Sequence, residues 1–260
     1  MEERVKLDDF EQLVAAHPVL ASHAEFLRGL LKPCVRIQVT DQSPRDAQSR
    51  FGGIPLLPPG FAWPQHGVGV YRFLAQIDFS EIVNRPESLP EAGLLVLFYA
   101  EYAPDSDDEE EIFWGDEGYV KAVFFEDPAV LVATPPPRGK AVPGRRILLT
   151  GEWDLPRHSD LRKGWPLDAE VLDGLLEDPG AMYGKPSPDA LLPTDYLLGY
   201  PSYYSLGYDP TPGPQWVSLL TLHSHDAFEW CWHDGDKLMV FIEQDRLAAR
   251  DFGALQCDAG

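Results

Sequence analysis

The sequence predicts an α+β fold built mostly from antiparallel β-sheets, in two related halves that follow N-terminal helices. Helical periodicity is confined mainly to the first 32 residues. Short apolar or alternating runs fill the rest, and they are too closely spaced for the helical crossovers that parallel strands need. The 260 residues can form a well-buried core. The 25 prolines and 22 glycines indicate short elements joined by loops.

The N-terminal segment is predicted to be helical. Asp8 and Glu11 have the spacing of a capping box. Apolar residues recur at helical spacing on both sides of His17-Pro18, where a helix is expected to break. This pattern predicts two helices, or one kinked helix, that end before Pro33. The alternation of apolar and polar residues in 34–40 then predicts a half-buried strand.

The remaining elements are predicted to be mainly strands. Apolar or alternating runs bounded by Gly, Pro, Asp and Ser predict strands at 71–79, 93–100, 119–126, 145–150, 216–222, 228–233 and 237–242. Short helices are expected at 80–83, 168–176 and 244–250. Strands outnumber helices, so antiparallel pairing is the expected arrangement.

A weak internal repeat predicts two related halves. The segment FGGIP ends at Pro55 and precedes a strand containing Gln76, 21 residues later. The segment LLGYP ends at Pro201 and precedes a strand containing Thr221, 20 residues later. We interpret the two copies as descendants of one unit, with chance similarity as the alternative. We expect a single domain over 1–260, with these parts: helices and first strand 1–48, first half 49–133, irregular linker or insert 134–195, second half 196–260.

The stretch SRFGGIPLLPPGFAWP, residues 49–64, is predicted to form a structural corner. A phosphate-binding loop needs converging backbone N–H donors before a helix, but this stretch has prolines at those positions and no helix after it. Residues 55–58 also match PxxP, a pattern common in proline-rich loops. Gly52 and Gly53 permit backbone angles closed to other residues, which favours the corner.

The composition indicates a cytoplasmic protein that repels nucleic acid. The 42 acidic and 21 basic residues give a net charge of −21, which repels nucleic acid and anionic lipid and attracts cationic partners. The alternative is that the acidic surface only maintains solubility. No run approaches the ~18 apolar residues of a membrane span, and no signal-peptide pattern occurs. Cys34, Cys231 and Cys257 lack CxxC spacing, which indicates reduced thiols.

The best candidate for a metal site is the segment 222–236. His223 and His225 would share one face of a strand, and Cys231 and His233 would share a face across a short hairpin. Such a set could bind zinc; the alternative is a hairpin whose polar side carries imidazoles. The acidic run at 105–111 lacks the residue order of an EF-hand, which argues against calcium.

No catalytic signature is present in the sequence. Glu152, Asp154 and His158 are close in sequence, but no nucleophile accompanies them. We therefore expect no catalytic constellation and no tightly bound cofactor. An enzyme, most simply a hydrolase, would need a deep pocket with converging polar groups and shifted pKa values.

With these segments together, the chain resembles the YwqG-like family of bacterial proteins of unknown function. The resemblance rests on LKPCVRIQVT, SRFGGIPLLPPGFAWP, FLAQIDFSEI, LPEAGLLVLFY, LLGYP, LLTLHSHD and DRLAARDF. It implies an α+β fold with mostly antiparallel sheets and two related halves, and it implies no settled activity. Family members usually carry Asp-Ser-Asp where this chain has His223-Ser224-His225. Some relatives resemble immunity genes that lie near secreted toxins.

These observations predict a cytoplasmic protein-binding module that neutralises a basic protein partner, such as a bacterial toxin. A carboxylate-rich loop can occupy a basic cleft by mimicking phosphate, while a nearby aromatic residue supplies affinity. The expected contact residues are Asp107, Asp108, Glu109, Glu110, Glu111 and Trp114. The alternatives are a small-ligand or metal-binding protein, or an uncharacterised hydrolase.

Overall fold

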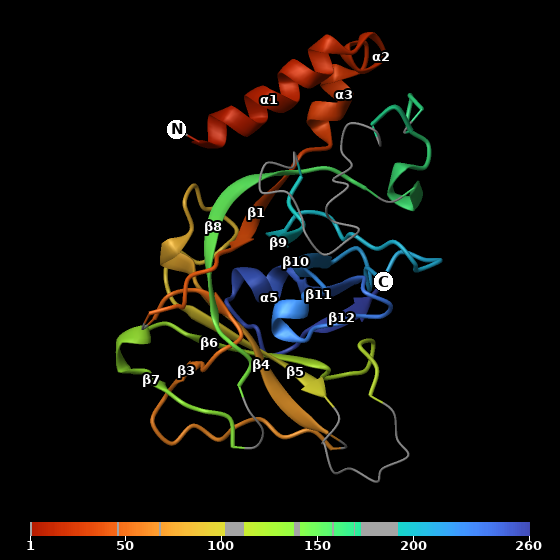
Figure 1. Cartoon of the computed structure of the whole chain (residues 1–260). Helices are drawn as coiled ribbons and strands as arrows, with labels where there is room; N and C mark the ends of the chain where they lie inside the picture. Colours follow the sequence, from red (N-terminus) through yellow and green to blue (C-terminus); the bar gives the residue numbers. More distant parts are fainter. Residues whose placement is uncertain are drawn as a thin grey trace.

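A large antiparallel sheet forms the centre of the molecule in the computed structural model (Figure 1). The structure describes residues 2–45, 47–67, 69–101, 112–137, 141–157, 159–168, 170–172 and 192–260. Within these ranges the sheet has ten strands in the order β12-β11-β10-β9-β1-β8-β2-β4-β5-β6, and every ladder is antiparallel. The prediction of a mostly antiparallel β protein with a few helices is therefore confirmed.

The longer strands are those that alternating or apolar runs predicted, and the remaining strands have two to four residues. Those of the large sheet are β1 (Lys32–Val39), β2 (Arg50–Phe51), β4 (Val70–Asp78), β5 (Leu94–Glu101), β6 (Val120–Phe125), β8 (Arg145–Asp154), β9 (Asp195–Leu198), β10 (Trp216–His223), β11 (Lys237–Glu243) and β12 (Gln256–Ala259). A separate pair joins β3 (Leu56–Leu57) to β7 (Val132–Ala133). The segment 134–195 thus contributes β8, one of the two central strands.

The N-terminal helices lie at one end of the sheet, at the top of Figure 1. They are α1 (Glu2–Ala16), α2 (Pro18–Ala21) and α3 (Ala24–Gly29). The predicted break is confirmed, because His17 caps α2 and Pro18 is its first residue. The helices have their own small core, in which buried residues such as Phe10 and Leu27 contact Leu155 and Leu172.

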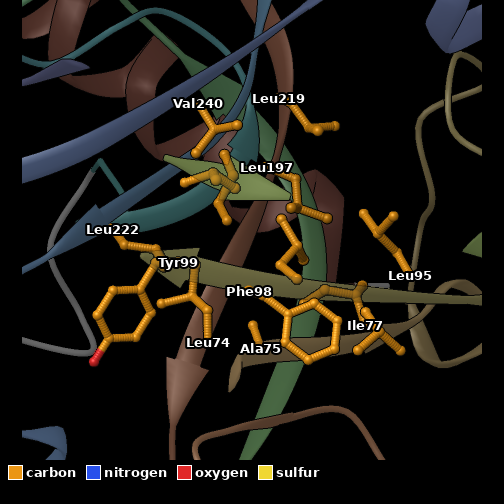
Figure 2. Packing of buried hydrophobic residues seen from close by; sticks show 14 of the residues in the cluster. Leu74, Ala75, Ile77, Leu95, Phe98, Tyr99, Leu197, Leu219, Leu222 and Val240 are labelled. Atoms are coloured by element: carbon orange, nitrogen blue, oxygen red, sulfur yellow. The ribbon is translucent and has the colours of Figure 1, made fainter. Parts of the chain in front are cut away.

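The main core lies between the two arms of the sheet. One arm is β2-β4-β5-β6 and the other is β9-β10-β11-β12, with β1 and β8 between them. Figure 2 shows Leu74 and Phe98 of the first arm in one cluster with Leu197, Leu222 and Val240 of the second. The sheet therefore curves around a shared hydrophobic interior instead of enclosing two separate ones.

The inner strand of each arm ends in the same unusual backbone conformation. Gly52 and Gly53, which follow β2, have φ of 59° and 77°. Leu198 and Gly199, at the end of β9, have φ of 61° and 75°. A second strand irregularity also recurs: β4 carries a register shift around Leu74 where it pairs with β5, and β10 carries one before Leu220 where it pairs with β11.

The predicted strand at 228–233 is wrong. The chain leaves β10 at His223 and forms a short 3-10 helix, η5 (Asp226–Phe228). Glu229 and His233 then adopt left-handed conformations with φ of 59° and 47°, which interrupt an extended strand. These reversals turn the tryptophans of this segment into the main core.

Of the three predicted short helices, the one at 168–176 lies largely outside the described residues. The prediction at 244–250 is confirmed by α5 (Gln244–Ala248), and the one at 80–83 overlaps the 3-10 helix η1 (Phe79–Glu81). A third 3-10 helix, η2 (Pro128–Val130), follows β6, and η3 (Ser159–Arg162) follows β8. Among the described residues, no helix is long and apolar enough to cross a membrane.

Candidate functional site

The predicted histidine hairpin is organised by a carboxylate from a different strand. Asp195, the first residue of β9, accepts a hydrogen bond from the backbone N–H of His223 at 2.7 Å. Its other oxygen lies 2.7 Å from Nε2 of His225. Asp195 is 30 positions from His225 in the sequence, so sequence spacing gave no sign of this pair.

His225 is a largely buried imidazole within an aromatic cluster. Its ring packs against Phe51, Phe228 and Trp230. Burial opposes protonation of the ring, but the charge and hydrogen bond of Asp195 outweigh it, so the pKa of His225 is raised above 6.5. Because the carboxylate of Asp195 contacts Nε2 of His225, this ring nitrogen has a structural role.

The other predicted metal ligands do not converge with His225. Nδ1 of His223 lies 2.6 Å from the carbonyl oxygen of Ser224. Cys231 is exposed and its Sγ donates to the backbone carbonyl of His233, whose ring instead packs on Trp114. In the part of the chain that the structure describes, no three His, Cys, Asp or Glu side chains are grouped to bind a metal ion.

Of the predicted partner-binding residues, the structure describes only Trp114. Residues 107–111 lie outside the described residues. Trp114 is half-buried, with its ring 5.6 Å from that of His233 and its carbonyl accepting a hydrogen bond from Cys257. Phe113 beside it is 48% exposed. Of the two aromatic residues, Phe113 presents more apolar surface to solvent.

A large groove opens where the two arms meet the first strand. Its volume is about 1040 Å³, and its walls come from β1, the 85–91 loop, the start of β10 and α5 with the turn after it. The buried side chains of Leu89, Leu198 and Leu247 contribute to its apolar lining. Nothing in the sequence pointed to this groove, because its lining residues are spread from position 32 to position 250.

Three cationic side chains line the groove. Nζ of Lys32 lies 4.0 Å from the centre of the Tyr200 ring, and burial lowers the pKa of Lys32 although nearby carboxylates oppose this. Arg85 donates to the carbonyl oxygens of its own loop and so holds that wall in place. The guanidinium of Arg250 forms a long ion pair with Glu126, with 4.0 Å between its nitrogen and a carboxylate oxygen. Glu87 and Glu91 also line the groove.

The face of the sheet opposite the main core carries a buried polar cluster. The side chain of Asp154 is 0% exposed and binds Arg157 at 2.8 Å and the backbone N–H of Tyr200 at 2.8 Å. The guanidinium of Arg157 lies 5.0 Å from the centre of the Tyr196 ring. Asp154, one of the acidic residues singled out near Trp153, therefore has a structural role. Another, Glu152, forms an ion pair with Arg36 at 2.8 Å. His158 lies outside the described residues.

A lysine and a serine meet at the edge of this cluster. Nζ of Lys237, the first residue of β11, donates to Oγ of Ser202 at 2.6 Å. Burial and the charge of Arg157 lower the pKa of Lys237 to about 8, although Asp236, Asp195 and Asp154 oppose the shift. Sequence reasoning missed this pair, because its members are 35 positions apart and form no motif.

One comparison with known proteins finds a match. Residues 49–128 match the model of a domain of unknown function, DUF1963. The match covers less than a third of the chain and includes the corner at 51–55 and the first arm of the sheet. No curated protein matches the chain. The similarity therefore fits a domain of unknown function and supplies no activity.

Proposed function

We propose that this chain is a binding protein for a small anionic ligand with an apolar body, and that the groove is its site. The observation that carries the proposal is a cavity of about 1040 Å³ that combines buried leucines with Lys32, Arg85 and Arg250. Ligand sites are typically concave and mostly apolar, with a few charged groups that fix orientation. Cations outnumber carboxylates in this lining, although the whole chain carries −21.

The three cations have different roles in this proposal. Arg85 is tied to its own loop and shapes the wall. Lys32 and Arg250 are the side chains expected to meet the anionic group. The leucines receive the apolar body, and its removal from water supplies most of the affinity. Such a ligand resembles a fatty acid or an aromatic carboxylate in its chemistry.

The dye 8-anilinonaphthalene-1-sulfonate has this chemistry and provides a direct test. We expect it to bind the folded chain with increased fluorescence, and Lys32→Gln with Arg250→Gln to raise its Kd about fivefold, because two exposed charge contacts contribute about 0.5 kcal/mol each. Lys163→Gln, which removes an exposed cation elsewhere, is the matched control. Equal Kd values for all three proteins would place the dye outside the groove and contradict the proposal.

Our second candidate function is neutralisation of a basic protein partner by the acidic surface near Trp114. It is favoured by the net charge of −21 and by Phe113, an exposed aromatic side chain close to the run 107–111. Long-range attraction speeds encounter, while buried apolar anchors supply affinity.

A partner recovered by co-purification from the native host tests this second function. Reversing the charges of 107–111 should then slow association and weaken its salt dependence. Phe113→Ala should raise Kd about tenfold, the usual effect of losing an interface anchor. Val130→Ala changes an exposed apolar residue in η2, which follows β6, and should have no effect. Unchanged association after charge reversal would leave the acidic run without a binding role.

We further propose that the two arms descend from one duplicated unit and that the chain is a YwqG-like protein. The paired left-handed residues and register shifts of the arms support a duplication. The hydrogen bonds do too: Oγ of Ser49 accepts from the N–H of Asp78, as Asp195 accepts from the N–H of His223. The match at 49–128 covers the first copy.

The central strands support the same origin. Strands β1 and β8 pair with each other at the middle of the sheet. Each central strand then borders the arm that follows the other: β1 pairs with β9, and β8 pairs with β2. We propose that duplication was accompanied by an exchange of first strands. We also retain the proposal of a cytoplasmic location, which the three free cysteines support.

A further inference from the structure

Ser202 and Lys237 have the arrangement of a nucleophile and its base. We propose that they form an acyl-transfer site, in which Ser202 is the nucleophile, Lys237 accepts its proton, and the substrate is a small ester. The proposal goes beyond the binding function above and does not depend on it. Its basis is the 2.6 Å contact between Nζ and Oγ, because a general base must lie within hydrogen-bond reach of the proton it removes.

The surroundings of Lys237 suit a base. The side chain is half-buried, and its backbone is fixed opposite His223 at the end of the β10–β11 ladder. With a pKa of about 8, roughly a tenth of the amine is neutral at pH 7 and half is neutral at pH 8. A neutral amine can accept a proton from a serine hydroxyl, which is the basis of known Ser-Lys pairs.

The surroundings of Ser202 hold its hydroxyl in place. The neighbouring Tyr203 is buried against Met239 and Phe241, so the segment after β9 is anchored to β11 beside the lysine. Ser202 is 5% exposed, which restricts the acyl donor to a small group. Pro201 lines the groove, so the proposed nucleophile follows directly after a wall residue of that groove.

Ser205 shows what distinguishes Ser202. Its Oγ lies in the same segment and is exposed, but it donates to the carboxylate of Asp236 at 2.9 Å and lies 3.4 Å from Nδ1 of His233. Ser205 thus contacts a carboxylate and an imidazole instead of an amine. It is therefore a control for the pairing with Lys237 proposed at Ser202.

The proposed reaction is balanced with water as the second reactant. Oγ of Ser202 attacks the ester carbonyl carbon while its proton moves to Nζ of Lys237. The bond from the carbonyl carbon to the alcohol oxygen breaks, and the alcohol leaves with the proton from Lys237. Water then attacks the acyl carbon and gives one proton to Lys237. The bond from the acyl carbon to Oγ breaks, Lys237 returns the proton to Oγ of Ser202, and the carboxylic acid is released. No oxidation or reduction occurs.

Acetylation by p-nitrophenyl acetate tests the site in the full chain. We expect one acetyl ester on Ser202, located by peptide mass mapping and removed by hydroxylamine, which leaves acetyl amides on lysines intact. Its rate of formation should rise with pH with a midpoint near 8. Ser202→Ala should abolish the ester, and Ser205→Ala should leave its rate unchanged.

Two lysine variants separate chemistry from structure. Lys237→Arg keeps a hydrogen-bonding cation that does not lose its proton, and Lys237→Met removes the charge. Both should slow acetylation of Ser202 about a hundredfold or more, the usual contribution of a general base. An ester on Ser205 instead, no hydroxylamine-sensitive acetyl group, or an unchanged rate in Lys237→Arg would each overturn the proposal. If the Lys237–Ser202 hydrogen bond has only a structural role, these variants should differ from the wild type in unfolding temperature, and no ester should form on Ser202 in any of the proteins.

Discussion

Replacing Arg157 with methionine is expected to lower the free energy of unfolding by about 3–5 kcal/mol, the usual cost of leaving one partner of a buried ion pair without the other. Asp154 is fully buried and receives 2.8 Å hydrogen bonds from the guanidinium of Arg157 and the backbone of Tyr200. In the variant, the carboxylate of Asp154 loses the hydrogen bond from Arg157 and keeps the one from the backbone N–H of Tyr200. The carboxylate, at the end of the central strand β8, would then lack its ion-pair partner.

Urea unfolding of the wild type and the variant measures this effect. Arg28→Met is the matched control, because Arg28 forms a 3.0 Å ion pair with Glu11 but its side chain is 59% exposed. We expect the control to lose less than about 1 kcal/mol. Similar losses for both variants would mean that burial does not strengthen the Asp154–Arg157 pair.

Replacing His225 with glutamine is expected to destabilise the protein more at pH 6 than at pH 9. The pKa of His225 is raised in the folded state, so its ion pair contributes fully below the unfolded value of 6.5. The contribution is lost as pH rises through the folded-state pKa. At pH 6 we expect a loss of about 1.5–3 kcal/mol, the usual range for a hydrogen bond to a charged group.

The measurement is the free energy of unfolding across pH 6–9 for both proteins. The difference between them should shrink as the pH rises, because the wild type loses the charge on His225. His23→Gln, at the N-terminus of α3, changes a histidine outside this cluster and should give a difference that does not follow this trend. A constant difference for His225→Gln would indicate that folding does not raise the pKa of this ring.

Much of the fold could be predicted from the sequence, because long strands and helices carry their own periodicity. The helices around His17-Pro18 and the strands β4, β5, β10 and β11 follow their apolar patterns. Strands β2 and β9 have two and four residues, too few to show a period, and their position depends on pairing with β8 and β1. The segment 228–233 has a strand-like pattern that left-handed residues override.

The site could be predicted only in part, for a related reason. His225 was identified because histidines cluster in its segment, but Asp195, which determines its state, comes from a strand 30 positions earlier. Ser202 and Lys237 are common residue types in unremarkable contexts, and only the packing of the segment after β9 against β11 brings them within 2.6 Å. Chemistry formed by tertiary pairing leaves no local pattern to detect.

The position of β1 between β8 and β9 has a consequence for synthesis on the ribosome. Strand β1 is made early, yet its partners are β8 and β9, and Ile37 meets Asp195 only after about 160 further residues. At a typical rate of about 5–20 residues per second, roughly 10–30 s would pass before both backbone edges of β1 are paired. Exposed strand edges are templates for aggregation. The nascent chain would therefore need protection by a chaperone during this interval, although the finished protein buries β1 at the middle of its sheet.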